Sequence, residues 1–234
     1  MHPTETAEDA DDMTAIVIVT YNAAIYTALC LLSLRRTRGL PVSTIVVDNN
    51  SGALTRFVLR TMFKFGSIDR LVLLDENTLF SPECNVGAAV VPCDAQHILL
   101  LNPDTIVRDP DWLAKPARAH RGAGAVAYGR ARGGSVTRAD GYCFLVDRAT
   151  GDAIGGLDES FEWWWAITRF QADVLRSHGS VAAIEGHGHL LRHFGGKSGD
   201  AWRSAKGMDT PHESIASWFD GLPAVEVIAA SDVE

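Results

Sequence analysis

Four short runs of apolar residues in the first half of the chain each end in acidic or amide side chains. The runs are 16–19, 45–47, 71–74 and 98–101, and they lead into Thr20-Tyr21-Asn22, Asp48-Asn49-Asn50, Asp75-Glu76-Asn77 and Asn102-Pro103-Asp104. Continuous apolar runs of this length are typical of parallel strands that helices cover on both faces. Because ligands bind outside the carboxyl ends of such strands, we predict that these polar residues converge on one site.

Residues at helical spacing separate the apolar runs. After Asn22, a favourable N-cap, Ile25, Leu29 and Leu32 keep helical intervals. A second amphipathic pattern ends at Gly66, and its apolar members are Leu54, Phe57, Val58, Met62 and Phe65. A short helix is predicted near 84–91. The alternation of strands and helices predicts an α/β layered sheet.

The second half of the chain is less regular. We predict helices over 111–120 and 166–178 and strands over 123–128 and 142–146, and Ile167, Phe170 and Val174 give the last helix its spacing. No internal repeat or linker divides the chain. The predicted organisation is a disordered acidic tail over 1–12, one domain over 13–220 and a C-terminal tail over 221–234.

Composition excludes some classes of function. The 234 residues carry a net charge of −8 without a long basic stripe, so nucleic acid is not an expected partner. No apolar stretch reaches the roughly 18–20 residues of a membrane span, and the first residues do not look like a secretory signal. Four scattered cysteines do not predict a disulfide framework, and the apolar surroundings of Cys30 and Cys143 predict buried free thiols, which fits a reducing cytoplasm. Arginine outnumbers lysine by 17 to 4, which weakly indicates a GC-rich bacterial genome.

The segment Asn102-Pro103-Asp104 after the fourth run carries the candidate chemistry. A carboxylate at a strand end can take one or two positions on Mg²⁺ or Mn²⁺ and leave the others to substrate phosphates. Taken alone, the same segment is more typical of an Asx-Pro turn that ends a strand. The rest of the sequence decides between these interpretations.

Six motifs in the correct order resemble those of the family-2 glycosyltransferases, which have the GT-A fold. They are 16–22 (IVIVTYN), 45–52 (IVVDNNSG), Asn77 with 85–87 (NVG), 99–105 (LLLNPDT) with 111–113 (DWL), 155–161 (GGLDESF) and 193–198 (HFGGKS). The resemblance implies a single GT-A-like α/β domain with a mostly parallel sheet flanked by helices. It also implies transfer of a hexosyl or deoxyhexosyl group from a nucleotide-diphospho-sugar to an acceptor hydroxyl, usually with inversion.

The resemblance implies a nucleotide site at matching positions. Thr20, Tyr21 and Asn22 would line the nucleoside pocket. Asp48 would accept the imide N–H of a uracil or thymine ring, which favours a UDP- or dTDP-linked donor. Further nucleotide contacts are expected from Asn49, Asn77, Asn85 and Asn102.

The resemblance also implies a metal site. Asp104 resembles the second aspartate of the family's Asp-x-Asp motif, and Asn102 stands at the first position. His193 matches a histidine that approaches the metal or the diphosphate. These matches imply Mg²⁺ or Mn²⁺ as the cofactor. His187 and His189 form an H-x-H pair nearby, which we interpret as surface histidines rather than zinc ligands.

The sequence departs from the family at the catalytic base. The family's Gly-Gly-x-Asp-Glu-x-Phe motif is followed by an acidic pair that opens a helix, but here that place holds Ala166-Ile167. Our hypothesis assigns the base to Glu162, which lies close to the lost pair, with Asp158 as the second choice.

The acceptor is not specified by any motif. The tryptophans at 163–165 form either a stacking platform for it or a packing or homodimer contact. We expect a saccharide or a small natural product, because no hydrophobic anchor is present. Two rival functions stay open, a non-catalytic relative that binds a nucleotide-sugar or a partner protein, and a nucleotidyltransferase. The second would need a glycine-rich phosphate loop, whereas residues 19–23 contain no glycine.

Overall fold

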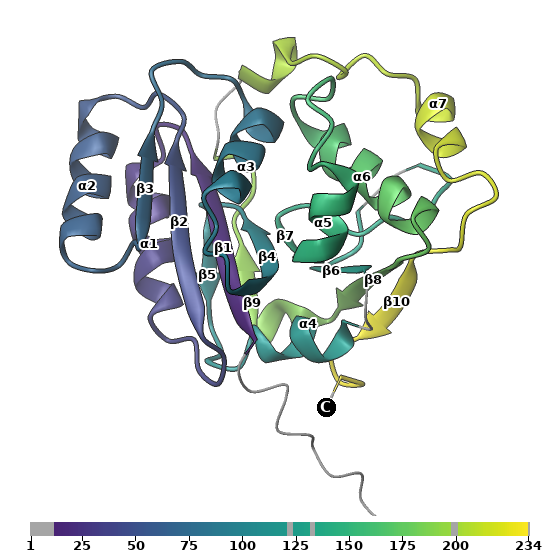
Figure 1. Cartoon of the computed structure of the whole chain (residues 1–234), viewed down its shortest axis with the longest axis horizontal. Coiled ribbons are helices and arrows are strands. Elements are labelled where there is room, and N and C mark those ends of the chain that lie inside the picture. The colour runs from purple at the N-terminus through teal and green to yellow at the C-terminus, as the bar shows by residue number, and fades with distance from the viewer. Residues whose placement is uncertain (1–11, 121–123, 132–133, 198–200, 234) are drawn as a thin grey trace, which may run out of the picture.

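The computed structural model describes residues 12–120, 124–131, 134–197 and 201–233. The expected tail over 1–12 therefore lies, except for Asp12, outside the described residues. The rest forms an α/β fold with a mostly parallel central sheet, as predicted. Figure 1 shows the sheet between helices on its two faces.

The strands follow from the apolar runs. In chain order the central sheet contains β1 (Met13–Thr20), β2 (Val42–Asp48), β3 (Arg70–Leu73), β4 (Ala95–Leu101), β6 (Gly124–Tyr128), β7 (Cys143–Asp147), β8 (Ser180–Glu185) and β10 (Glu226–Ala229). Their spatial order is β10-β8-β6-β7-β4-β1-β2-β3, and β7 runs antiparallel to both of its neighbours. The four apolar runs and the predicted strands in the second half correspond to β1–β4, β6 and β7, apart from residue 123, which lies outside the described ranges.

Helices cover both faces of this sheet. On one face lie α1 (Ala24–Leu34), α2 (Ala53–Lys64) and α4 (Ala114–Ala119), and on the other lie α3 (Phe80–Ala89), α5 (Arg148–Ile154) and α6 (Trp164–Arg176). Side chains of a strand alternate between faces, so β1 places Ile16 and Ile18 in one hydrophobic core and Val17 in the other. A shorter helix, α7 (His212–Ser217), precedes β10.

A separate two-stranded sheet lies beside the end of β4. It pairs β5 (Thr105–Val107) with β9 (Leu191–His193) in antiparallel orientation, with Thr105 opposite His193. This pairing joins the segment after β4 to a segment far along the chain.

Two sequence-based expectations are wrong for local reasons. Asn22 is not the N-cap of α1, which begins after Ala23. Asn22 has a φ of 50°, and its Oδ1 accepts a hydrogen bond from the N–H of Gly52 (2.8 Å). The tail expected over 221–234 contains β10, which pairs in parallel with β8. Most β10 side chains are exposed, as is usual at a sheet edge, although residues 227–230 form a short apolar run.

The predicted helices exist with shifted ends. The helix expected over 111–120 is reduced to α4, and the one expected near 84–91 begins earlier, at Phe80. The helix expected over 166–178 is α6, and its Ile167, Phe170 and Val174 are buried. None of the helices in the described part of the chain has both the length and the apolar character that crossing a membrane requires.

Candidate active site

A cavity of about 1750 Å³ opens at the carboxyl edge of the central sheet. Tyr21 follows β1, Asn49 follows β2, Asn77 lies in the loop after β3, and Asn102 and Asp104 follow β4. All five residues line the cavity. Because β1–β4 run parallel to one another, their carboxyl ends lie on the same side of the molecule. The four polar strand ends therefore meet around one space.

Asp104 and His193 approach each other at the edge of this cavity. The pairing of β5 with β9 carries the histidine to the aspartate. His193 Nε2 lies 3.2 Å from Asp104 Oδ1, and the Asp104 side chain is almost fully buried. Asn102 Nδ2 lies 3.4 Å from the same histidine nitrogen. Asn102, Asp104 and His193, which the resemblance places at the metal site, are thus in contact.

This pair fits a divalent cation. Two atoms that ligate one octahedral ion at about 2.1 Å lie about 3 Å apart, close to the observed separation of 3.2 Å. Among the described residues, no group of three or more His, Cys, Asp or Glu could hold a metal ion. The pair would leave several coordination positions to phosphate oxygens, as is usual for Mg²⁺ sites that bind a substrate.

Tyr142 connects His193 to a second histidine. The Tyr142 ring stacks on His193, with ring centroids 4.3 Å apart and an angle of 11° between the planes. Its hydroxyl donates to His187 Nε2, because His187 Nδ1 donates to the carbonyl of Ile184 (2.8 Å). Burial lowers the pKa of His187, which keeps the ring neutral and able to accept this bond. His187 is partly buried and lines the cavity, so the expectation of a surface histidine is wrong for it.

Asp48 lies fully buried behind the cavity wall. Its Oδ2 accepts hydrogen bonds from Arg56 Nε (2.8 Å) and from the N–H of Ser51 (3.2 Å). Its Oδ1 is buried and has no hydrogen-bond partner within the described residues. Since an unpaired buried acceptor is costly, Oδ1 is well suited to receive a donor from a ligand.

Besides Asp48, three further residues predicted to bind the nucleotide do not line the cavity: Thr20, Asn22 and Asn85. The Thr20 hydroxyl lies 2.7 Å from that of Thr27, inside the protein. Asn85 Nδ2 donates to the carbonyl of Leu157 (2.9 Å), and its Oδ1 accepts from the N–H of the same residue (2.8 Å). The Asn85 amide therefore fastens the loop after α5 to α3.

The two predicted bases also lie outside the cavity lining. Glu162 Oε1 is 3.3 Å from Lys206 Nζ, and its Oε2 accepts from the N–H of Lys206 (2.8 Å). Asp158 Oδ1 accepts from the N–H (2.9 Å) and from the hydroxyl (2.6 Å) of Ser160. Both carboxylates hold loops in place, so their geometry favours a structural role.

Sequence reasoning missed Arg138 and Asp140, which line the cavity just before β7. Arg138 is only 5% exposed, and its guanidinium carbon lies 5.4 Å from the ring centroid of Trp165. Burial lowers the pKa of Arg138, and the nearby Asp140 carboxylate opposes this. Because β7 is antiparallel, its amino end reaches the cavity. A search restricted to carboxyl ends of strands passes over these residues.

The tryptophans at 163–165 line the same cavity at the start of α6. Phe80 packs edge-on against Trp163, with centroids 6.2 Å apart. The indole N–H of Trp165 is buried and has no hydrogen-bond partner in the described part of the chain. The three tryptophans thus form part of the cavity wall, and the indole N–H of Trp165 is left as an available donor.

A sequence model of the family described as Glycosyl transferase family 2 matches residues 15–192, more than half of the chain. The chain belongs to glycosyl transferase family 2. In this family-2 chain, the match includes Asp48, Asn102 and Asp104 and ends one residue before His193. A search of curated proteins finds no match.

Solved glycosyltransferase structures share the fold of this family-2 chain. The mannosyltransferase PcManGT from Pyrobaculum calidifontis, in complex with GDP-Man and Mn²⁺, gives a TM-score of 0.61 at 15% identity, over 72% of this chain and 53% of that chain. S. aureus TarS 1–349 in complex with UDP-GlcNAc gives 0.55 at 14% identity, over 69% and 53%. GalNAc-T7 with UDP, GalNAc and Mn²⁺ gives 0.58 at 12% identity, over 72% and 41%. The chain spans about half the length of the first two structures and less of the third.

Proposed function

We propose that this chain transfers a sugar from a nucleotide-diphospho-sugar to an acceptor hydroxyl, with inversion, and that it depends on Mg²⁺ or Mn²⁺. The observation that carries the proposal is the Asp104–His193 pair, with Nε2 and Oδ1 3.2 Å apart at the edge of the large cavity. Family membership supports the same class of reaction. Asp104 and His193 would hold the cation, which supplies charge neutralisation for the departing diphosphate.

The donor is proposed to carry a pyrimidine base. Asp48 Oδ1 is a buried acceptor that lacks a partner among the described residues, and the imide N–H of uracil or thymine would supply one. The Arg56 ion pair holds the other oxygen, which fixes the orientation of the carboxylate. UDP- and dTDP-linked sugars therefore fit this position. GDP-mannose, which the Pyrobaculum enzyme holds, is the alternative to test.

Asp140 is proposed as the base that deprotonates the acceptor. The carboxylates lining the cavity within the described ranges belong to Asp104, Asp140 and Glu185. Asp104 is assigned to the cation, and Glu185 forms an exposed ion pair with Arg130 (3.2 Å). Asp140 is the one that remains.

The position of Asp140 also supports this role. It precedes Gly141, where an added Cβ would lie 3.2 Å from the Ile167 side chain. Ile167 occupies the place of the acidic pair that relatives use. Asp140 is one residue from Gly141, so its carboxylate could take the proton from an acceptor hydroxyl bound near Ile167.

Calorimetric titration tests the donor site and the cation. Mn²⁺ should raise the affinity for UDP, and UDP should bind more tightly than GDP. Asp104→Asn should lose the effect of Mn²⁺. Asp94→Asn, an exposed aspartate just before the opposite end of β4, should keep it. Equal affinity with Mn²⁺, with EDTA and in Asp104→Asn would contradict the proposed cation site.

Turnover tests the base. With an active donor–acceptor pair, Asp140→Asn should lower the rate of transfer by about 10²–10⁴-fold without changing UDP affinity. Asp158→Asn and Glu162→Gln serve as controls, because their carboxylates hold loops. Full activity in Asp140→Asn would exclude Asp140 as the base. Tight nucleotide binding without transfer or donor hydrolysis, over a broad donor panel, would instead favour the non-catalytic alternative.

A further inference from the structure

Helix α1 is apolar on two sides. Residues 24–34 contain no charged side chain. Cys30, Leu31 and Leu34 are buried toward the sheet, whereas Ile25, Leu29 and Leu32 are exposed. Their spacing of four and three residues places the exposed three on one stripe. A helix that is hydrophobic all round is usually covered on every side, but within the described residues nothing covers the outer stripe of α1.

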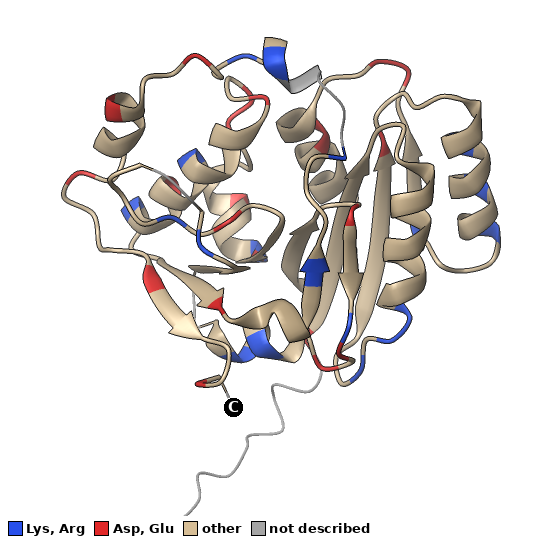
Figure 2. Ribbon diagram, turned by 180° about the vertical axis from the view of Figure 1, so that it is seen from behind, with Lys and Arg blue, Asp and Glu red and all other residues tan. Residues whose placement is uncertain are grey.

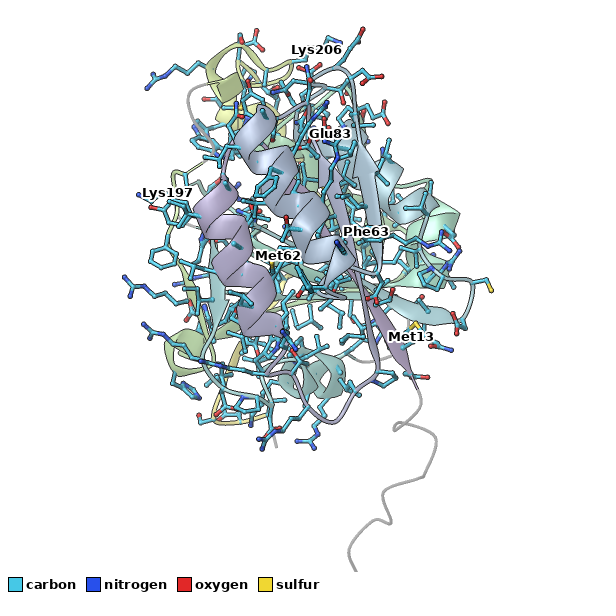
Figure 3. All side chains as sticks on the ribbon, turned by 90° about the vertical axis from the view of Figure 1, so that its left-hand side faces the viewer. Met13, Met62, Phe63, Glu83, Lys197 and Lys206 are labelled. Carbon is cyan, nitrogen blue, oxygen red and sulfur yellow. The ribbon has the colours of Figure 1, made fainter. Side chains whose placement is uncertain are left out.

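Helix α2 extends this apolar surface. It packs beside α1, and both helices lie on the side that faces the viewer in Figure 3. Leu54, Phe57 and Phe65, in or at the end of α2, are exposed. Phe63 of α2 is exposed as well, and we call the other six exposed side chains the α1–α2 face: Ile25, Leu29, Leu32, Leu54, Phe57 and Phe65. They are 42–74% exposed. Apolar patches of this kind mark sites of interaction with a protein or a membrane.

The same segment is strongly basic. Residues 13–68 contain six cations (Arg35, Arg36, Arg38, Arg56, Arg60 and Lys64) and one carboxylate, Asp48, a net charge of +5. Asp48 is buried, so the surface carries no acid from these residues. Blue residues without red ones mark α2 in Figure 2. The whole chain has a net charge of −8, so the rest carries −13. Residues 13–68 therefore carry a net charge of the opposite sign to that of the remainder of the chain.

Two further cations border α1. Arg192 lies over the ring of Phe194 at 4.6 Å, and Lys197 lies over the ring of Tyr26 at 5.6 Å. Tyr26 and Phe194 contact each other, with centroids 5.6 Å apart. Since Tyr26 belongs to α1, this cluster brings positive charge to the flank of the apolar stripe.

We infer that the α1–α2 face docks on the surface of an anionic lipid bilayer. Phe, Leu and Ile side chains among Lys and Arg are suited to the boundary between headgroups and acyl chains. A second copy of the chain is disfavoured, because it would bring two positive faces together. The two cavities of about 1750 and 430 Å³ are lined by residues outside the α1–α2 face, and docking on a lipid surface requires no pocket.

Sedimentation of the full chain with vesicles tests this inference. The protein should bind vesicles of phosphatidylcholine with 30% phosphatidylglycerol, and binding should weaken as salt increases. It should bind pure phosphatidylcholine vesicles at least about tenfold more weakly. Phe57→Ser with Leu54→Ser, and separately Arg60→Glu with Lys64→Glu, should each weaken anionic binding about tenfold or more.

Two matched controls locate the effect. Val227→Ser removes an exposed apolar side chain from β10, and Arg176→Glu reverses an exposed charge at the end of α6. Both should bind like the parent protein. No binding to anionic vesicles, equal binding to neutral ones, or equal losses in the controls would each overturn the inference. Self-association that the α1–α2 substitutions abolish, without vesicle binding, would overturn it in favour of a protein contact.

Discussion

On one face of the sheet, α6 buries its apolar side chains after the exposed Trp164, and on the other, α1 and α2 leave several apolar side chains exposed. Phe170 and Val174 of α6 are at most 4% exposed, whereas Ile25 and Phe57 on the opposite side of the sheet are 72% and 68% exposed. Helical spacing predicts both kinds of segment equally well. The outer side of α6 carries charged residues such as Asp173, but the outer side of α1 is as apolar as its inner side. The periodicity of apolar residues identifies a helix. A difference in polarity between the two sides of the helix is also needed to predict which side packs in the core.

The largest difference in stability between the two faces should come from removing a phenylalanine ring on each. Phe170 packs against Phe144 in the core on the α6 side, with centroids 6.1 Å apart. Phe170→Ala should lower the free energy of unfolding by about 3–5 kcal/mol, through lost burial and a residual cavity. Phe57→Ala, the matched change on α2, should change it by about 0.5 kcal/mol or less. Urea denaturation measures both, and similar losses would remove the contrast.

The next largest effect should be a dependence of the free energy of unfolding on pH, which comes from Glu83 in α3. Burial raises the pKa of Glu83 to about 8, although Thr78 donates two hydrogen bonds to its Oε1. The unfolded chain has the lower pKa, about 4.3. The folded state therefore holds an extra proton between these values, and its stability falls as pH rises through this window.

Substitution isolates the contribution of Glu83. Glu83→Gln should gain about 2–4 kcal/mol relative to the parent protein between pH 5 and pH 8. Denaturation at both pH values measures the difference. A constant difference would show that Glu83 has the same pKa in the folded and unfolded states.

A smaller loss of stability should follow from adding a side-chain atom where α3 packs closely on the sheet. A Cβ at Gly87 would lie 2.4 Å from Val17 Cγ1 and 3.2 Å from Val47 Cγ2. Gly87→Ala should therefore cost about 1–3 kcal/mol by overpacking. In Gly151→Ala on α5, the nearest atom would be 3.9 Å away, and this change should be neutral or stabilise by up to about 1 kcal/mol. Thermal unfolding that ranks them the other way would contradict the close packing of α3.

The smallest effect belongs to the outer stripe of α1. Leu29→Gln and Leu32→Gln should each change the free energy of unfolding by about 0.5 kcal/mol or less, because both side chains are largely exposed. Chemical denaturation in the absence of lipid is the measurement. A loss above about 2 kcal/mol would mean that this stripe packs against the protein itself.

The sequence predicts the sheet better than the site because strands leave a stronger signal. Buried parallel strands such as β1 and β4 need continuous apolar runs, and those runs are visible. The exposed edge strand β10 has only the short run over 227–230, which does not separate it from a tail. The strand-end rule finds Asn49, Asn77 and Asp104, because it depends only on where each run stops.

The rest of the site depends on features that have no local signal. Asp140 and Tyr142 lie at the amino end of a strand, and only the antiparallel direction of β7 brings them to the cavity. Closeness in sequence to the missing acids favours Glu162 as the base, but its carboxylate forms an ion pair with Lys206 instead. Distance along the chain is a poor guide wherever the backbone changes direction between neighbouring residues.

The pairing of β5 with β9 has a consequence for the growing polypeptide. Asp104 emerges from the ribosome long before His193, and only the strand after His189 brings the histidine to it. A nascent chain that ends just after Asp104 contains the four polar strand ends but only one member of the proposed cation pair. Capture of a divalent ion by both side chains must therefore wait until synthesis has passed His193.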